Sequence, residues 1–170
     1  MAIIEQRFLP VPNLWSRHSC LHAVLDLGHL QHALSSDVPG FVDALLHALP
    51  GLRHCADTLR RGCFMAEVVG MAMQDLQRRA GAAPPSSFAA TVLGRAGQCR
   101  LIVACASQAA GERACAEALT LVKDLARAAR HSAPPIVIPA HRARRHGPGL
   151  PPARLTAASD SGRAHPAPGR

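Results

Sequence analysis

The sequence predicts an α+β domain: a mostly antiparallel sheet with three helices on one face, in the order β-β-α-α-β-β-α. Two observations carry this prediction. Short β-tolerant segments come in pairs, at residues 3–9 with 21–27 and at 88–93 with 99–105, and segments of helical periodicity separate and follow these pairs. At 170 residues the chain is long enough for one such domain with its own core.

Residues that stop a strand bound the predicted sheet segments. Two prolines follow Leu9 at the end of the first strand, and Gly28 ends the second. The second pair is joined by Gly-Arg-Ala-Gly at 94–97, a composition that favours a hairpin. The run Ile-Val-Ile at 136–138 is compatible with a short final strand.

Three helices are predicted from a change to a period of 3.6 residues. The first starts near Pro39, which is tolerated in a first turn, and is stopped by Pro-Gly at 50–51. The second, at 64–80, is the most strongly predicted element, with arginines in its last turn and a glycine after it. The third covers residues 111–130 and has an apolar stripe along one side.

The composition changes after residue 140, where Arg, Pro, Gly, Ala and Ser dominate without periodicity. We therefore expect a domain at residues 1–140 and a disordered basic tail at 141–170. The tail holds six arginines and one aspartate, which is +5 of the net charge of +8. A basic tail can hold phosphate nonspecifically, but no aromatic residues are interleaved for base stacking, so we do not expect specific nucleic-acid binding.

The cysteine pattern and the apolar runs indicate a cytoplasmic location. The six cysteines form no C-x-x-C pair, and their spacing fits neither a zinc ribbon nor a small disulfide scaffold. The N-terminus has no basic segment followed by a long apolar stretch, and no apolar run approaches 18 residues. We expect no membrane segment, and cysteines that act mainly as small buried residues.

Motifs for nucleotide or nucleophilic chemistry are missing from the sequence. It contains no P-loop, no G-x-G-x-x-G and no G-x-S-x-G, and its single lysine, Lys123, lies inside a predicted helix. We therefore predict no catalytic residues, no cofactor-binding residues and no cofactor. Four histidines lie close together and suggest a metal site, but two of them fall at the start of a predicted strand, so they do not share a helical face. They are His18, His22, His29 and His32.

Four segments resemble, in order and with comparable spacing, the start of cyanophycin synthetases. They are Leu-Pro-Val-Pro-Asn-Leu-Trp-Ser-Arg at 9–17, Ala-Val-Leu-Asp-Leu-Gly at 23–28, Pro-Gly-Phe through Leu-Pro-Gly-Leu at 39–52, and Arg-Gly-Cys through Leu-Gln-Arg-Arg-Ala-Gly at 61–81. The resemblance covers about residues 3–130. It implies an N-terminal domain that holds an Asp-Arg storage polymer, while ATP-grasp and Mur-ligase-like regions elsewhere in such enzymes carry out the ATP-dependent synthesis.

The resemblance also assigns residues and partners. The polymer (cyanophycin), a full-length synthetase or a second copy are the implied partners, and the implied polymer-binding residues are Asn13, Trp15, Arg17, Arg61 and Arg78. Some members carry the zinc motif His-x-x-Glu-His on the second helix, and hydrolyse polymer with it. The corresponding positions here are Glu67, Gly70 and Met71, so both ligands and the base are replaced and we predict no metal site.

The region after residue 140 departs most from the family. It resembles high-GC coding sequence read out of frame, so we expect a truncated or frame-shifted member, which translation of the other two frames would test. Our first hypothesis is a noncatalytic, polymer-holding domain that lacks the ATP-using regions. The second is a residual metal-dependent hydrolase that uses the N-terminal histidines, and the third is a basic-tailed nucleic-acid binder.

Overall fold

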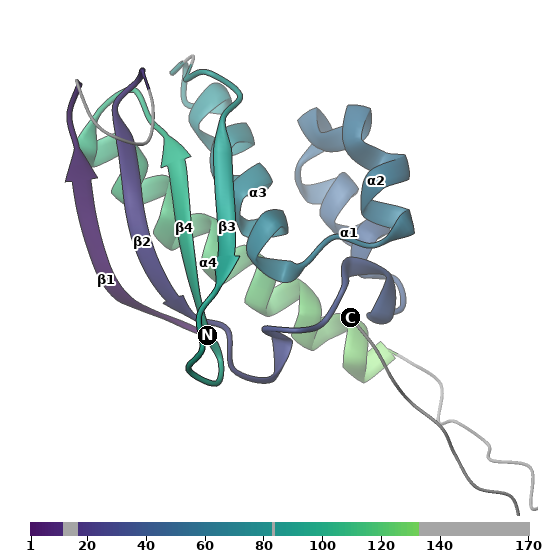
Figure 1. Ribbon diagram of the computed structural model, residues 1–170. Coiled ribbons are helices and arrows are strands. Elements are labelled where there is room, and N and C mark those ends of the chain that lie inside the picture. The colour runs from purple at the N-terminus through teal and green to yellow at the C-terminus, as the bar shows by residue number, and fades with distance from the viewer. Residues whose placement is uncertain (12–16, 83, 133–170) are drawn as a thin grey trace, which may run out of the picture. The chain divides into compact units, whose positions relative to one another are not determined.

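A computed structural model of the chain describes residues 1–11, 17–82 and 84–132. The strands in these residues form one antiparallel sheet in the order β1-β2-β4-β3 (Figure 1). Their bounds are β1 Ala2–Leu9, β2 Cys20–Asp26, β3 Phe88–Val92 and β4 Gln98–Ala104. The predicted α+β class, the antiparallel sheet and the β3–β4 hairpin are confirmed, with strand ends within one residue of those predicted.

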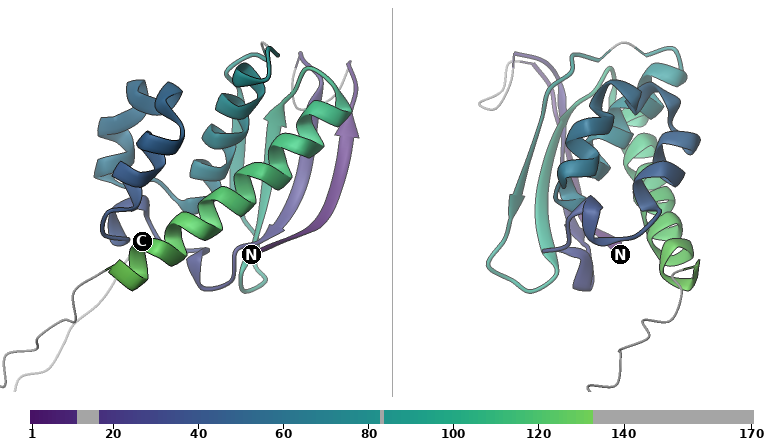
Figure 2. Two further views of the ribbon diagram at one scale, coloured as in Figure 1. Left: turned by 180° about the vertical axis from the view of Figure 1, so that it is seen from behind. Right: turned by 90° about the vertical axis from the view of Figure 1, so that its right-hand side faces the viewer.

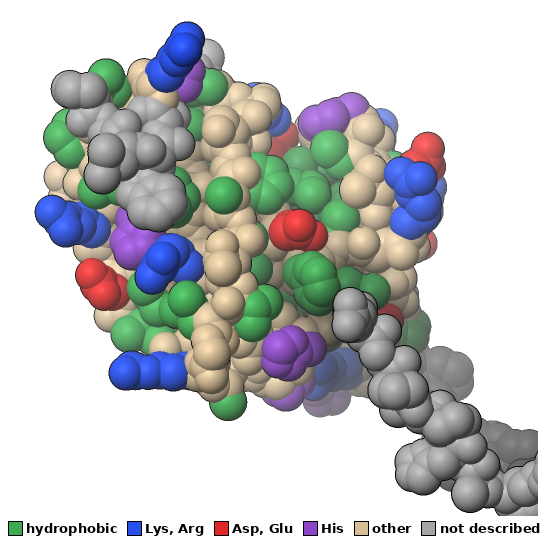
Figure 3. Space-filling model, viewed as in Figure 1, with side chains coloured by type: hydrophobic (Ala, Val, Ile, Leu, Met, Phe, Trp, Pro, Cys, Tyr) green, Lys and Arg blue, Asp and Glu red, His purple; other side chains and the backbone are tan. Residues whose placement is uncertain are grey.

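The register of the two central strands gathers their buried side chains on one face. Alternate residues of β2 and β4 are buried, as expected for strands with one covered face. The pairing sets these residues opposite one another across the strands, as Leu21 with Val103, Ala23 with Leu101, and Leu25 with Cys99. The other face carries the half-buried side chains, and Figure 3 shows hydrophobic, basic and histidine side chains mixed over it.

Two long helices cover the buried face of the sheet, and two short ones lie beside them (Figures 1 and 2). The helices are α1 Phe41–Ala48, α2 Ala56–Arg61, α3 Met65–Arg79 and α4 Gln108–Ser132, with short 3₁₀ segments η1 Gly28–Leu30, η2 Ser35–Asp37 and η3 Pro50–Cys55. Helices α3 and α4 lie on the sheet, whereas α1 packs on α4 and η3, so only two of the three predicted helices cover the sheet. Helix α2 was not predicted, because it and η3 each bury a single leucine and so show no apolar stripe.

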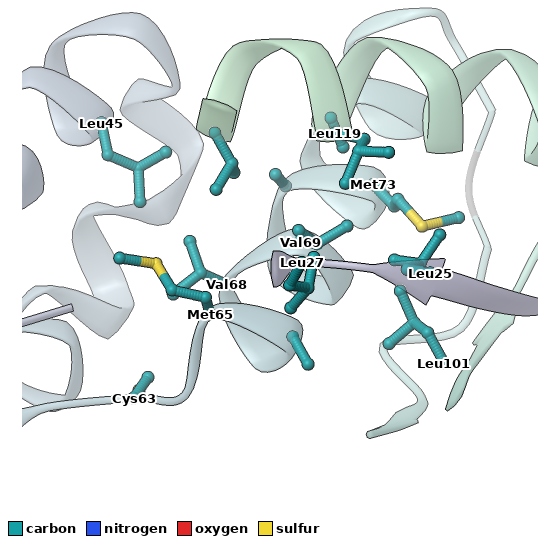
Figure 4. Packing of buried hydrophobic residues seen from close by; sticks show 14 of the residues in the cluster. Leu25, Leu27, Leu45, Cys63, Met65, Val68, Val69, Met73, Leu101 and Leu119 are labelled. Atoms are coloured by element: carbon teal, nitrogen blue, oxygen red, sulfur yellow. The ribbon is translucent and has the colours of Figure 1, made fainter. Parts of the chain in front are cut away.

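The core is built from aliphatic and sulfur-containing side chains between the helices and the sheet. Helix α3 contributes Met65, Val68, Val69 and Met73, all fully buried, which meet leucines of β2, β4 and α4 (Figure 4). Burying each such side chain stabilises the fold by about 1.5–3 kcal/mol. This core agrees with an aromatic content of only 3%.

Several predictions concern residues outside the described part. They are the strand at 136–138, the disordered tail at 141–170, and the polymer-binding residues Asn13 and Trp15. Within the described part, no helix has the length and hydrophobicity needed to cross a membrane.

Candidate functional site

The residues at the zinc-motif positions of α3 stabilise the helix and its packing. Glu67 Oε2 accepts a hydrogen bond from the backbone N–H of Phe64 at 3.0 Å, so this carboxylate satisfies a donor at the start of its own helix. Met71 is half-buried and packs against the core. Neither side chain is therefore arranged as a metal ligand.

Gly70, where the motif has its glutamate, lies directly against the sheet. A Cβ atom at this position would lie 2.7 Å from Cδ2 of Phe88 and 3.2 Å from Cδ1 of Leu101. A glutamate would need the space that the Phe88 ring fills. Strand side chains thus occupy the position that the catalytic base of a zinc hydrolase requires.

The four N-terminal histidines lie in different surroundings. His22 is half-buried on the sheet face opposite the helices, where burial, followed by the nearby Arg100 guanidinium, lowers its pKa. His29 lies in η1 and contacts Arg130 of α4, while His18 and His32 are exposed. In residues 1–11, 17–82 and 84–132, no group of three or more His, Cys, Asp or Glu side chains gathers as a metal site would require.

Polar side chains in the second half of α3 form hydrogen bonds with the end of β4 and with the segment before β3. The Gln77 amide donates to the Ala104 carbonyl at 3.2 Å and accepts from the Ala106 N–H at 3.4 Å. Nearby, Arg78 donates to Ser86 Oγ at 2.7 Å, and Gln74 to the Pro85 carbonyl at 3.4 Å. These bonds fasten the helix to the end of β4 and to the segment before β3.

The structure separates the predicted polymer-binding arginines. Arg17 precedes β2, and Arg78 lies at the same end of the sheet, because Gln77 bonds to Ala104, which pairs with Cys20. Arg61 ends α2 shortly before α3 begins at Met65, and Met65 lies about 20 Å from Arg78 along the axis of α3. Arg17 and Arg78 therefore share one end of the sheet, whereas Arg61 lies near the other end of α3, and polymer binding by these arginines stays a prediction.

A surface of mixed charge surrounds Arg61. We define the α2 surface as the exposed charged side chains of the mutually contacting α1, η3 and α2: Asp43, Arg53, Asp57, Arg60 and Arg61. Arg60 and Asp43 form an ion pair at 3.2 Å, with side chains 58% and 77% exposed. Figure 3 shows acidic and basic side chains next to one another over α1 and α2. This surface offers ion-pair partners of both signs to a ligand.

Asp75 is not part of this surface, although it lies on the neighbouring α3. It is 3% exposed, and its Oδ2 atom has no hydrogen-bond partner among the described residues. Its Oδ1 atom lies so close to Gly51 that a Cβ there would be 1.9 Å away. The Asp75 carboxylate packs between η3 and α3, and because it is buried there it cannot contact a ligand at the surface.

The buried thiols do not have the character of nucleophiles. Burial is the main cause that raises the pKa of Cys99 to about 11, with the nearby Asp26 adding to it, and burial likewise raises the pKa of Cys105 to about 11. Cys63 stands just before α3, where a helix N-terminus would favour a thiolate, yet burial and the Glu67 carboxylate raise its pKa. All three remain thiols at neutral pH.

Comparison of the sequence with known proteins identifies a family model and relatives that match it. The model of the cyanophycin synthase-like N-terminal domain matches residues 22–127. The cyanophycin synthetases of Trichormus variabilis and of a Nostoc species are each 33% identical to the chain over 93 residues, which is 48% of this chain and 10% of each relative. The chain therefore spans about a tenth of the length of these curated relatives.

Proposed function

Because the chain belongs to the cyanophycin synthase-like N-terminal domain family, we propose that it holds an Asp-Arg polymer and is not itself a catalyst. In this proposal it acts as a cytoplasmic scaffold, in which the buried thiols stay reduced. Any ATP-dependent peptide-bond formation would belong to ligase regions that residues 1–132 do not provide. A full-length synthetase or a second copy of the chain is the partner that such a role would require.

The mixed charge of the α2 surface is the observation that carries this proposal. A poly-aspartate backbone with arginine on each side chain carries guanidinium groups and arginine carboxylates in every repeat. A complementary surface must therefore provide both carboxylates and cations, as the α2 surface does. Exposed pairs of this kind contribute weakly one at a time, so a repeating polymer gains affinity by engaging several of them.

The packing of α3 argues against hydrolysis by the route that the zinc motif would provide. Glu67 caps its helix, Phe88 fills the space beside Gly70, and Met71 packs against the core. Since no ligand set replaces the lost one among the described residues, we propose binding without cleavage.

Retention on polymer granules tests the proposal. The full chain, mixed with purified insoluble polymer at 0.15 M salt, is expected to sediment with the granules. The variant R53Q/R61Q should reduce the bound fraction about fivefold, since each lost exposed pair weakens binding by up to about 1 kcal/mol. The control R7Q/R95Q removes the same charge from exposed positions of β1 and the β3–β4 hairpin, and should bind normally.

Two results would overturn the proposal. Retention no greater than that of an unrelated protein of similar charge would show that the chain does not bind the polymer. Release of soluble Asp-Arg dipeptide from the granules during the incubation would show a hydrolase instead.

A further inference from the structure

A pocket of about 320 Å³ lies between η1 and the second half of α4, and none of its lining residues belongs to the α2 surface. Its apolar lining includes Leu27, Leu30 and Ala126, all at least 96% buried. Its other lining side chains are almost all cationic or imidazole groups: His29, Lys123, Arg127, Arg130 and His131. The volume falls within the range of small-molecule sites.

Helical spacing brings the cations of α4 to one side of the helix. Positions 123, 127, 130 and 131 fall within an arc of about 100° around the axis, adjacent to the buried Ala126. From Lys123 to Arg130 they extend about 10 Å along the helix. The pocket therefore has an apolar floor and an extended basic wall.

No acidic side chain offsets this charge among the described residues that line the pocket. Within the described part of the chain, neither Lys123 nor Arg127 forms an ion pair. Like charges at i,i+4 repel each other and cost a few tenths of a kcal/mol in a helix. The first half of α4 differs, because Arg113 there pairs with Glu117 at 2.7 Å.

The helix dipole accounts for only part of this arrangement. Cations are favourable within the last turn of a helix, but Lys123 lies more than two turns before the end of α4. Arg130 is in the last turn, yet its guanidinium contacts Nε2 of His29 on another element. Because guanidinium can only donate, His29 accepts through Nε2 and carries its proton on Nδ1. The contact directs Arg130 across the pocket.

The side of the pocket that η1 forms, which includes His29, is held in place by Gln31, the residue after η1. Gln31 is buried, and its amide donates to the carbonyl of Gln98 at 2.8 Å and accepts from the Gly97 N–H at 2.5 Å. The backbone N–H of Leu27 also donates to the Gly97 carbonyl at 2.6 Å. These bonds tie η1 to the β3–β4 hairpin, so the pocket is preorganised.

From this geometry we propose that the pocket binds a compact polyanion through Lys123, Arg127 and Arg130. The ligand carries at least two carboxylate or phosphate groups, because one oxyanion cannot reach cations that extend over about 10 Å. Its body is small enough for about 320 Å³ and packs on Leu27 and Leu30. This site does not depend on polymer binding at the α2 surface.

Titration of the ¹⁵N-labelled full chain, followed by NMR, tests the site. The probes are citrate and pyrophosphate, with acetate and inorganic phosphate as matched single-group anions, at constant ionic strength set with NaCl. We expect saturable shifts of the amides of His29 and residues 123–131, with citrate or pyrophosphate binding at least about tenfold more tightly than its single-group counterpart. Tighter binding of citrate assigns carboxylates, and tighter binding of pyrophosphate assigns phosphates.

Two variants distinguish binding at this specific pocket from attraction of anions to the overall positive charge of the protein. K123Q/R127Q should weaken binding of the preferred probe at least about tenfold, whereas R53Q/R61Q, with the same loss of charge on the α2 surface, should leave it unchanged. Shifts that NaCl alone reproduces, equal affinity for single-group anions, or equal weakening by both variants would overturn the proposal. Loss of granule retention in R53Q/R61Q with intact citrate or pyrophosphate binding would show that the two sites are separate.

Discussion

Helices α3 and α4 cover the same face of the sheet, but they use their polar side chains in opposite ways. On the second half of α3, Gln77 and Arg78 are hydrogen-bonded to neighbouring segments of the fold. On the second half of α4, Lys123 and Arg127 form no ion pair within the described residues and line a pocket. The comparison indicates that α3, which carries the family's zinc motif in some members, has a structural role here, whereas α4 has charge available for a ligand.

Restoring a glutamate on α3 should cause the largest loss of stability. Gly70→Glu forces a side chain into the Phe88 ring and buries a carboxylate, so we expect the free energy of unfolding to fall by about 4 kcal/mol or more. Urea unfolding monitored by circular dichroism measures this change, and Gly70→Ala, which adds one methyl group at the same place, should cost clearly less. A folded E67H/G70E/M71H variant that binds one zinc ion would show that α3 keeps a usable metal site.

Removing the Gln77 amide should produce the next largest effect. Gln77→Leu leaves the buried Ala104 carbonyl without this donor and the Ala106 N–H without its acceptor, so we expect a loss of about 2–3 kcal/mol in the free energy of unfolding. Gln74→Leu, which removes one bond of 3.4 Å, is the matched substitution on the same helix and should cost less. Equal losses in both variants would contradict a specific role for Gln77.

The thiols beneath the two helices should make stability fall at high pH. The pKa of Cys99 and Cys105 is about 11 in the folded protein, against an ordinary value of 9.0, so folding favours their protonated form. Their contribution is full below pH 9 and is lost as the pH rises from 9 towards 11. Urea midpoints measured from pH 8 to 11 should decline more steeply for the unmodified protein than for C99A/C105A, and parallel curves would contradict this assignment.

Neutralising the basic wall of α4 should have the smallest effect on stability. K123Q/R127Q removes charges that repel each other, so we expect the free energy of unfolding to rise slightly, by less than about 0.5 kcal/mol. Thermal unfolding at low and high salt measures this change. A large loss of stability would mean that these cations, like Gln77, hold the fold together.

Sequence patterns predicted the elements of the fold much better than its contacts. Among the described residues, patterns of short β-tolerant segments between turn residues identified β1 to β4, and patterns with a period of 3.6 identified the two long helices, because each of these helices buries a continuous face. They missed α2, which buries only Leu59. They also missed the pocket: Lys123 was treated as a residue inside a helix, and no local pattern shows that His29 contacts Arg130, 101 positions later in the chain.

The polymer-binding residues stay a prediction, but the structure shows how far apart two of them lie. The resemblance implies Arg61 and Arg78 among these residues. Arg61 precedes the start of α3 and Arg78 lies near its end, and the mixed charge around Arg61 includes Asp43, which belongs to another segment. Family patterns identify residues along the chain, but only the packing of α1 against α2 shows which charges form a surface.

The order of strands in the sheet has a consequence for how the chain folds. Strands β1 and β2 follow each other in sequence, as do β3 and β4, so each pair can form early as a local hairpin. The central pairing of Cys20 with Ala104 closes a loop that contains α1, α2 and α3, so it carries a larger entropic cost of loop closure than either hairpin. Until then the most apolar strands, β2 and β4, each expose an unpaired edge, and we expect the joining of the two hairpins to be the slow and aggregation-prone step of folding.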